Sequence, residues 1–179
     1  GKSEWDEELL RDIAERFQAR THCGAAREIV NCAEVRSRSL HDTIVRLQAA
    51  GLDSIPGGGA EMLDDGVRHR ISRLKCTSQD WIDVHRTAHS LGMRTTATMM
   101  FGCGETIEQR MNHFDIVRQI QEDTGGFTAF IPCTFQRENT SLGRFVKEDA
   151  TAWEYLTTLA ISRIYRENLL TFQSSWVTL

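Results

Sequence analysis

The chain has 179 residues and a formal net charge of −4, and its basic residues are scattered along the sequence. That length fits one domain, and scattered positive charge argues against nucleic acid as a partner. No apolar run approaches the roughly 18 residues that a membrane span needs. The polar first residues are no signal peptide, so we expect a soluble, cytoplasmic protein without a membrane partner.

Helical and strand patterns alternate along the chain. Apolar spacing predicts helices over residues 5–17, 25–35, 39–50, 81–90, 107–122 and 149–168. Short apolar or β-branched runs predict strands over residues 18–22, 52–55, 94–101, 127–131 and 170–177. Ser39 is a suitable N-cap for its helix, with Asp42 three residues on, and Gly51 closes that helix.

A helix between each pair of strands is the pattern of βα units around a parallel sheet. Pro56 and Pro132 both stand just after predicted strand ends. Five strands do not close a barrel, because the common closed form needs eight. An open doubly wound sheet would carry a switch-point motif, which we do not find. The fold class is therefore α/β with about five parallel strands in one domain, and the chain looks truncated at both ends.

The apolar run at 52–55 ends in Pro56, three consecutive glycines (57–59) and, after Ala60, Glu61. Glycines are tolerated where the backbone turns sharply or approaches a ligand closely. A Rossmann fingerprint would need Gly at position 62, which is Met62, and a P-loop would need a Lys after its last glycine. The segment is either part of a small-molecule site or a tight turn in which Glu61 is a solvated helix-start residue.

The five cysteines are not spaced as CxxC and form no compact zinc-binding pattern. We therefore expect reduced thiols and no metal site within the chain. His85 and His89 have helical i,i+4 spacing, but Arg86 stands where a zinc protease needs Glu. We interpret both histidines as ordinary helix-surface residues.

Glycines and polar side chains also follow the other predicted strands. They lie at His22 and Cys23, at 102–105, at 132–136, and at Gln173 and Trp176. One rim with this character suits a ligand that carries amino acid and ribose groups. The alternative is that loops are polar and rich in glycine in any protein.

Several segments of the chain resemble the radical S-adenosylmethionine enzymes of the futalosine route to menaquinone. The resemblance rests on residues 55–61, on 95–102 with Glu105 and Thr106, and on 124–132. Residues 134–136, 139–140 and 173–178 are most similar to the members that cyclise dehypoxanthine futalosine. Aminofutalosine synthases and deazaflavin-forming enzymes are the alternatives, and a non-catalytic module that binds a nucleoside or S-adenosylmethionine is another.

The resemblance implies a (β/α)₈ barrel of which this chain covers roughly the third to seventh strands. It implies two cofactors, S-adenosylmethionine and a [4Fe–4S] cluster, and a nucleoside-derived substrate from which a 5′-deoxyadenosyl radical abstracts hydrogen before ring closure. The implied cofactor-binding residues are Gly57, Gly58, Gly59, Glu61, Met100, Gly102, Glu105, Ile131 and Pro132. The implied substrate-binding residues are His22, Thr98, Asn139, Gln173 and Trp176.

The sequence departs from the family pattern at several places. The CxxxCxxC loop that holds the cluster is absent from the chain, so its ligands are expected outside it. Cys103 stands where the family usually has His, Cys133 where an aromatic residue is common, and Arg27 and Arg137 where prolines are frequent. We therefore expect this chain alone to be inactive, and its open sheet edges to favour oligomers.

Overall fold

The computed structural model describes residues 5–17, 19–146, 148–165, 168–169 and 171–175. These residues form seven α-helices, one 3₁₀ helix and three strands. In chain order they are α1 (Trp5–Arg16), α2 (Ala26–Val35), α3 (Leu40–Ala49), β1 (Ser54–Ile55), α4 (Asp65–Ile71), α5 (Ser78–Ser90), β2 (Arg94–Phe101), α6 (Ile107–Thr124), β3 (Phe127–Thr134), η1 (Leu142–Arg144) and α7 (Ala152–Tyr165).

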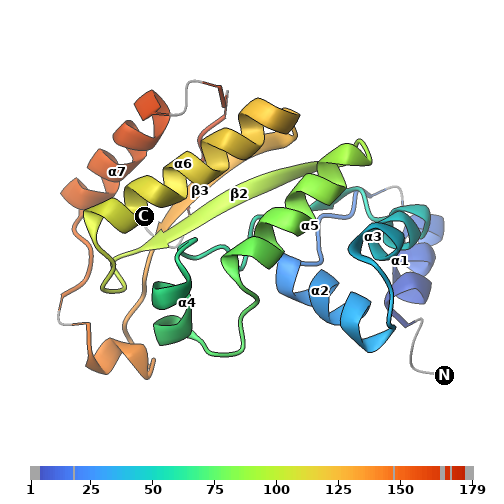
Figure 1. The fold of residues 1–179 in the computed structure, drawn as a ribbon, viewed down its shortest axis with the longest axis horizontal. Helices are drawn as coiled ribbons and strands as arrows, with labels where there is room; N and C mark the ends of the chain where they lie inside the picture. Colours follow the sequence, from blue (N-terminus) through green and yellow to red (C-terminus); the bar gives the residue numbers. More distant parts are fainter. Residues whose placement is uncertain (1–4, 18, 147, 166–167, 170, 176–179) are drawn as a thin grey trace.

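The three strands form one parallel sheet in the order β1-β2-β3, which confirms the α/β class. In Figure 1, α5 and α6 lie across one face of this sheet, with α1 to α3 beyond α5 and α7 beyond α6. The expected count of five strands is wrong for the described residues. The segments predicted at 18–22 and 170–177 contribute single parallel bridges, His22 to Ser54 and Phe130 to Phe172, although parts of both segments lie outside the described residues.

Pro132 lies inside β3 rather than after it, because β3 continues to Thr134. Proline cannot donate to a ladder, which is why the sequence predicted a strand end there. In the structure Pro132 stands opposite Met99 of β2, and its own carbonyl receives the hydroxyl of Tyr155 at 3.5 Å. The strand therefore passes through this position without a donor.

Side-chain caps fix where the helices begin. Ser39 accepts the amide of Asp42 at 3.0 Å, as expected for the start of α3. Thr106 and Gln109 form a reciprocal capping box at the start of α6, and Gly125 ends that helix with φ +60°. The sequence reasoning missed α4, whose seven residues start after the N-cap Asp64. Such a helix is too short to show a clear hydrophobic period.

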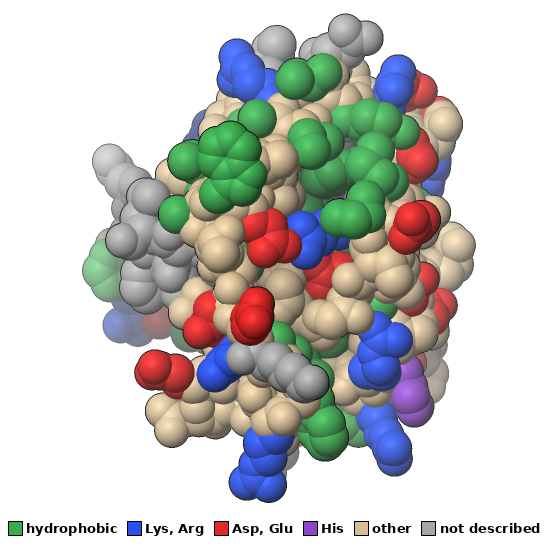
Figure 2. Space-filling model, turned by 90° about the vertical axis from the view of Figure 1, so that its left-hand side faces the viewer, with side chains coloured by type: hydrophobic (Ala, Val, Ile, Leu, Met, Phe, Trp, Pro, Cys, Tyr) green, Lys and Arg blue, Asp and Glu red, His purple; other side chains and the backbone are tan. Residues whose placement is uncertain are grey.

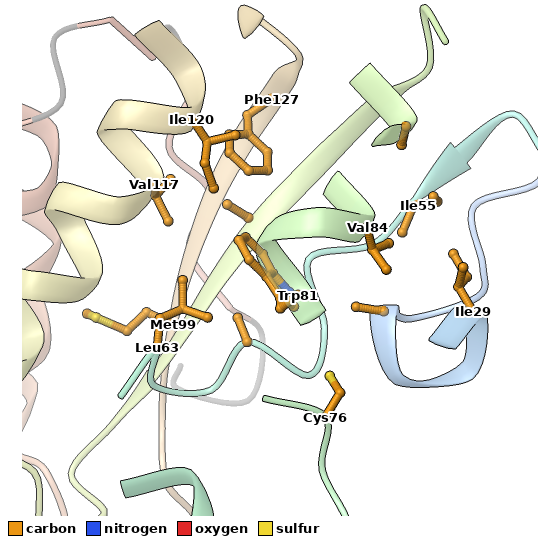
Figure 3. Close-up of a cluster of buried hydrophobic side chains, with 14 of the residues drawn as sticks. Ile29, Ile55, Leu63, Cys76, Trp81, Val84, Met99, Val117, Ile120 and Phe127 are labelled. Carbon is orange, nitrogen blue, oxygen red and sulfur yellow. The ribbon is translucent and has the colours of Figure 1, made fainter. Parts of the chain in front are cut away.

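The core lies between the sheet and the helices that cover it. On β2, residues Thr95, Ala97, Met99 and Phe101 are buried against those helices, whereas the alternate residues Thr96, Thr98 and Met100 are only half-buried. Figure 3 shows Trp81 of α5 at the centre of the cluster, with Val84 on the same helix and Phe127 on β3. The half-buried face of β2 is therefore the one that α5 and α6 do not cover.

His85 and His89 are not helix-surface residues, and that expectation is wrong. His85 is fully buried and His89 is 9% exposed, and both lie on the face of α5 that also carries Trp81 and Ala88. Their neighbour Thr95 on β2 supplies hydrogen-bond partners to both rings, at 3.0 and 2.7 Å. Buried polar rings are tolerated when they are hydrogen-bonded in this way.

Exposed apolar side chains gather over α6 and α7, with acidic and basic side chains below them (Figure 2). On α7 they are Trp153, Leu156, Ile161 and Ile164.

At the other side of the molecule, Glu7 holds α1 in place through Arg46 at 2.7 Å and Arg38 at 3.1 Å. None of the described helices is long and apolar enough to cross a membrane.

Candidate cofactor and substrate site

The loop after β1 is fixed to the neighbouring strand through Gly57. Its amide donates to the Thr96 hydroxyl at 2.9 Å, and its carbonyl receives the Thr98 hydroxyl at 2.6 Å and the Trp81 indole N–H at 3.3 Å. A Cβ at this position would lie 2.6 Å from the Cα of Ala97. Gly57 is therefore required by the packing of the loop on β2, whatever else it does.

Gly58 and Gly59 differ from Gly57, because a Cβ at either position would meet nothing within 4 Å. Gly59 has φ +83°, which favours glycine. These two residues present backbone to open space. Packing does not explain the absence of a side chain at Gly58, and the open space beside it leaves the backbone accessible.

Glu61 presents a carboxylate at the end of the same loop. Its backbone has φ +44°, an uncommon conformation for a residue other than glycine, and its carbonyl receives the Met100 amide at 2.7 Å. The carboxylate accepts the Lys75 ammonium at 2.7 Å, and the two side chains are 22% and 26% exposed. Glu61 is thus a paired carboxylate three residues before the cap of α4, not a solvated helix-start residue.

The turn after β2 is built around Glu105. Its carboxylate accepts the amides of Gly102 and Cys103, both at 2.8 Å, and the Arg110 guanidinium at 2.7 Å. Burial alone would raise the pKa of Glu105, but the Gly102 amide and the charge of Arg110 hold it below its usual range. Glu105 is a fully engaged anion that shapes the turn.

A cleft of about 660 Å³ lies beside this turn, between α4, η1 and the residues that follow η1. Its lining includes Gly102 and Glu105 together with Arg70, Leu142 and Phe145. Two of the predicted cofactor-binding residues therefore border a cavity large enough for a small molecule.

The half-buried face of the sheet brings several predicted residues into rows. Thr98 of β2 stands opposite Ile131 of β3, and Met100 stands opposite Cys133. The backbone amide of Gln173 donates to the Phe130 carbonyl at 3.0 Å, and the bridge from Phe130 to Phe172 puts Gln173 beside Ile131. Since Thr98 bonds Gly57, one row joins Gly57, Thr98, Ile131 and Gln173.

Pro132 lies on the opposite face of β3 from Ile131, in register with the buried Met99. The two residues expected to flank one ligand thus point to different sides of the sheet. Cys133 returns to the half-buried face. Burial, with the charge of Glu61 adding to it, raises the pKa of the Cys133 thiol to about 11, so a protonated thiol lies near the Glu61 carboxylate.

The other predicted substrate residues are less closely grouped. His22 bonds the Ser54 hydroxyl at 2.8 Å, and its register places it level with Arg94, four residues before Thr98 on β2. Asn139 is exposed, with φ +60°, in the loop after β3. Trp176 lies outside the described residues.

The sequence did not point to two basic residues, Lys75 and Arg68, beside the loop that carries Glu61. Lys75 pairs with Glu61, and the buried Arg68 donates to backbone carbonyls of the loop. A Lys or Arg several residues from a glycine run carries no spacing signal, since only the folded loop brings them together. Among the described residues no group of three or more His, Cys, Asp or Glu side chains could hold a metal ion.

Two family profiles match the chain. The profile described as Radical SAM superfamily matches residues 3–117, and that described as CofH/MqnC C-terminal region matches residues 124–179. The first covers well over half of the sequence, so the chain belongs to the Radical SAM superfamily, whose enzymes use S-adenosylmethionine and a [4Fe–4S] cluster. The family implies that the parallel sheet is part of a TIM-type barrel.

Three relatives with different names are similar over most of the chain. A cyclic dehypoxanthine futalosine synthase of Halalkalibacterium halodurans is 45% identical over 96% of this chain and 46% of its own length. An aminodeoxyfutalosine synthase of Thermus thermophilus is 38% identical, over 96% and 47%. A 5-amino-6-(D-ribitylamino)uracil–L-tyrosine 4-hydroxyphenyl transferase of Methanococcoides burtonii is 40% identical, over 89% and 46%. The chain thus spans about half the length of these relatives.

The rim fits S-adenosylmethionine better than it fits the cluster. Open backbone at Gly58 and Gly59 and the carboxylate of Glu61 are groups that a ligand with an ammonium and ribose hydroxyls requires. Cluster ligands are thiolates, and the described cysteines form no metal-binding group.

Proposed function

We propose that the protein carrying this sequence cyclises dehypoxanthine futalosine in menaquinone biosynthesis, and that this chain forms roughly the third to seventh strands of its barrel. The observation that carries the proposal is the row of Gly57, Thr98, Ile131 and Gln173 on the half-buried face of the sheet, beside the Glu61 loop. The 45% identity to a cyclic dehypoxanthine futalosine synthase, against 38% and 40% for the other two, favours this member of the superfamily.

In this proposal the cofactors supply the one-electron chemistry of hydrogen abstraction, and the chain supplies position and exclusion of water. Glu61 accepts hydrogen bonds from the ammonium or ribose hydroxyls of S-adenosylmethionine. Gly58 and Gly59 let that ligand approach the backbone. Glu105 acts through the turn that it holds, with Gly102 and Met100 shaping the adenine side.

The substrate would lie over the row of Gly57, Thr98, Ile131 and Gln173. Thr98 and Gln173 would be its polar partners, and Ile131 would be an apolar contact. His22, Asn139 and Trp176 remain predictions for this role. Pro132 faces the helix side, so in this proposal it supports β3 rather than touching the ligand.

The test isolates Glu61 in the full-length protein. Glu61→Gln keeps the shape of the side chain and removes its charge. A hydrogen bond to a charged group contributes roughly 1.5–3 kcal/mol, so affinity for S-adenosylmethionine should fall about 10- to 150-fold in calorimetric titration. Glu122→Gln is the control, because Glu122 forms an exposed pair with Arg118 on α6 and should change binding less than about twofold.

Equal affinities of the two variants would remove Glu61 from the site. Product analysis with dehypoxanthine futalosine and with the substrates of the two alternative enzymes decides between members of the superfamily. Binding of S-adenosylmethionine without turnover of any of these substrates would favour the non-catalytic module.

A further inference from the structure

The Arg68 guanidinium is buried, and no carboxylate of the described residues lies closer to it than 4.0 Å. Its side chain is 3% exposed, and its nearest acidic oxygen, on the exposed Asp65, is 4.0 Å away. Burial of a charge is costly unless its donors are satisfied. The donors of a buried arginine must therefore bond to other acceptors, and the position of those acceptors indicates the structural role of Arg68.

The acceptors are backbone carbonyls from two segments. From the glycine loop they are the carbonyls of Ala60 and Met62, the residues on either side of Glu61. From the segment after α4 it is the carbonyl of Cys76, which receives Nε at 2.9 Å and Nη2 at 2.6 Å. Cys76 directly follows Lys75, the partner of Glu61. One guanidinium thus joins the two segments that carry the Glu61–Lys75 pair.

Glu61 needs such a support because its φ of +44° is unfavourable for a residue with a side chain. The Met100 amide holds the Glu61 carbonyl, but that single bond does not fix the carbonyls on either side. Arg68 donates to both of them, with the longer contact, 3.5 Å, to the Met62 carbonyl, and its planar array of five donors can serve several acceptors at once.

We propose that Arg68 is a positioning residue for the Glu61 carboxylate, and that it acts by clamping the backbone on both sides of Glu61 to the segment that carries Lys75. The inference rests on the proposed function of Glu61 as a ligand of S-adenosylmethionine. Arg68 itself faces backbone and would not contact the ligand.

The first experiment needs no ligand and measures amide hydrogen exchange. In Arg68→Met, exchange of the Met100 and Leu63 amides should rise at least about tenfold, because both bonds depend on the position of the loop. The Thr95 amide at the far end of β2, bonded to Gly126, should keep its rate. A uniform rise along β2 would show general destabilisation and overturn the proposal.

The second experiment is a double-mutant cycle on S-adenosylmethionine affinity in the full-length protein, with Arg86→Met as the matched control because Arg86 forms an exposed pair with Asp123. Arg68→Met should weaken binding about tenfold or more, but less than about threefold when Glu61 is already Gln. Arg68→Lys keeps the charge but has only one donor atom, so its affinity for S-adenosylmethionine should lie between those of the unchanged protein and Arg68→Met. If Arg68→Met does not fold, the cycle is measured with Arg68→Lys alone.

The outcomes separate the two proposals. If Glu61→Gln leaves affinity unchanged, the proposed role of Glu61 fails while the exchange experiment still tests the clamp. If Glu61→Gln weakens binding and Arg68→Met does not, or if the two losses simply add, Arg68 does not act through Glu61.

Discussion

The two ends of β2 both carry polar networks, but the networks are built on opposite principles. At the carboxyl end, Glu61 and Lys75 form an ion pair in which each side chain is about a quarter exposed, and the backbone has positive φ at Glu61, Gly102 and Gly104. At the amino end, two neutral histidines are buried between α5 and the sheet. The first arrangement leaves groups that a ligand can reach, whereas the second holds the sheet to its helices.

The buried network has one consistent set of proton positions. Thr124 donates to the Ile120 carbonyl at 2.7 Å, so it accepts from Nδ1 of His89, whose Nε2 must then accept from Thr95. Thr95 in turn accepts from Nδ1 of His85. Nε2 of His85 is then a bare acceptor, consistent with its lack of a hydrogen-bond partner.

Trp81 joins the two ends and offers the largest test of the comparison. Its ring lies 4.0 Å from that of His85, and its N–H reaches the Gly57 carbonyl. Trp81→Ala should destabilise the chain by about 3–5 kcal/mol in urea unfolding, because it empties a fully buried site. Trp81→Phe keeps most of the packing and should cost about 1–2 kcal/mol. A loss below about 1.5 kcal/mol for Ala would mean that Trp81 does not join the two networks.

The amino end should make stability depend on pH. Burial, with the neighbouring His89 adding to it, lowers the pKa of His85 to about 3, and burial, with Arg94 and Arg86, lowers that of His89 to about 4. Below the unfolded pKa of about 6.5 the unfolded chain binds more protons than the folded chain. Stability should therefore fall as pH drops from 6.5 towards 4, by up to about 1.4 kcal/mol per pH unit for each histidine.

Urea unfolding at pH 7.5, 6.5, 5.5 and 5.0 measures this slope. His85→Gln should reduce it by about half, since each histidine contributes one proton. The matched control is His41→Gln, because the His41 side chain is 60% exposed in the folded chain. A slope that is unchanged by His85→Gln would show that groups other than His85 produce it.

The sequence predicted local features better than long-range ones. The bounds of β2 were predicted as residues 94–101 and the Ser39 cap as observed, because both depend on neighbours in the chain. The outer strands were over-predicted, since a strand is defined by its partners. The burial of His85 was missed, although its spacing from Trp81 and Ala88 places it on the same helix face.

The candidate site divides in the same way. The glycine run and Glu61 were visible in the sequence, and so was the set of strand-end residues. The pairing of Glu61 with Lys75 and the clamp by Arg68 were not, because they depend on how the residues from 57 to 76 fold back on themselves. That Ile131 and Pro132 lie on opposite faces of the sheet was also not visible in the sequence, because it depends on β3 continuing past Pro132 to Thr134.

Two threonines on β2 give the most direct comparison, and Thr98 gives the smallest expected effect. Thr98→Val at the carboxyl end removes one bond, but the Gly57 carbonyl keeps the Trp81 N–H, so unfolding should become easier by only about 0.5–1.5 kcal/mol. The same change at Thr95 leaves two buried histidine nitrogens without partners and should cost about 1–3 kcal/mol for each. Urea unfolding of both variants at pH 7.5 measures the difference. Equal losses would mean that the buried network is no more critical than the exposed rim, which would contradict the distinction between the two ends of the strand.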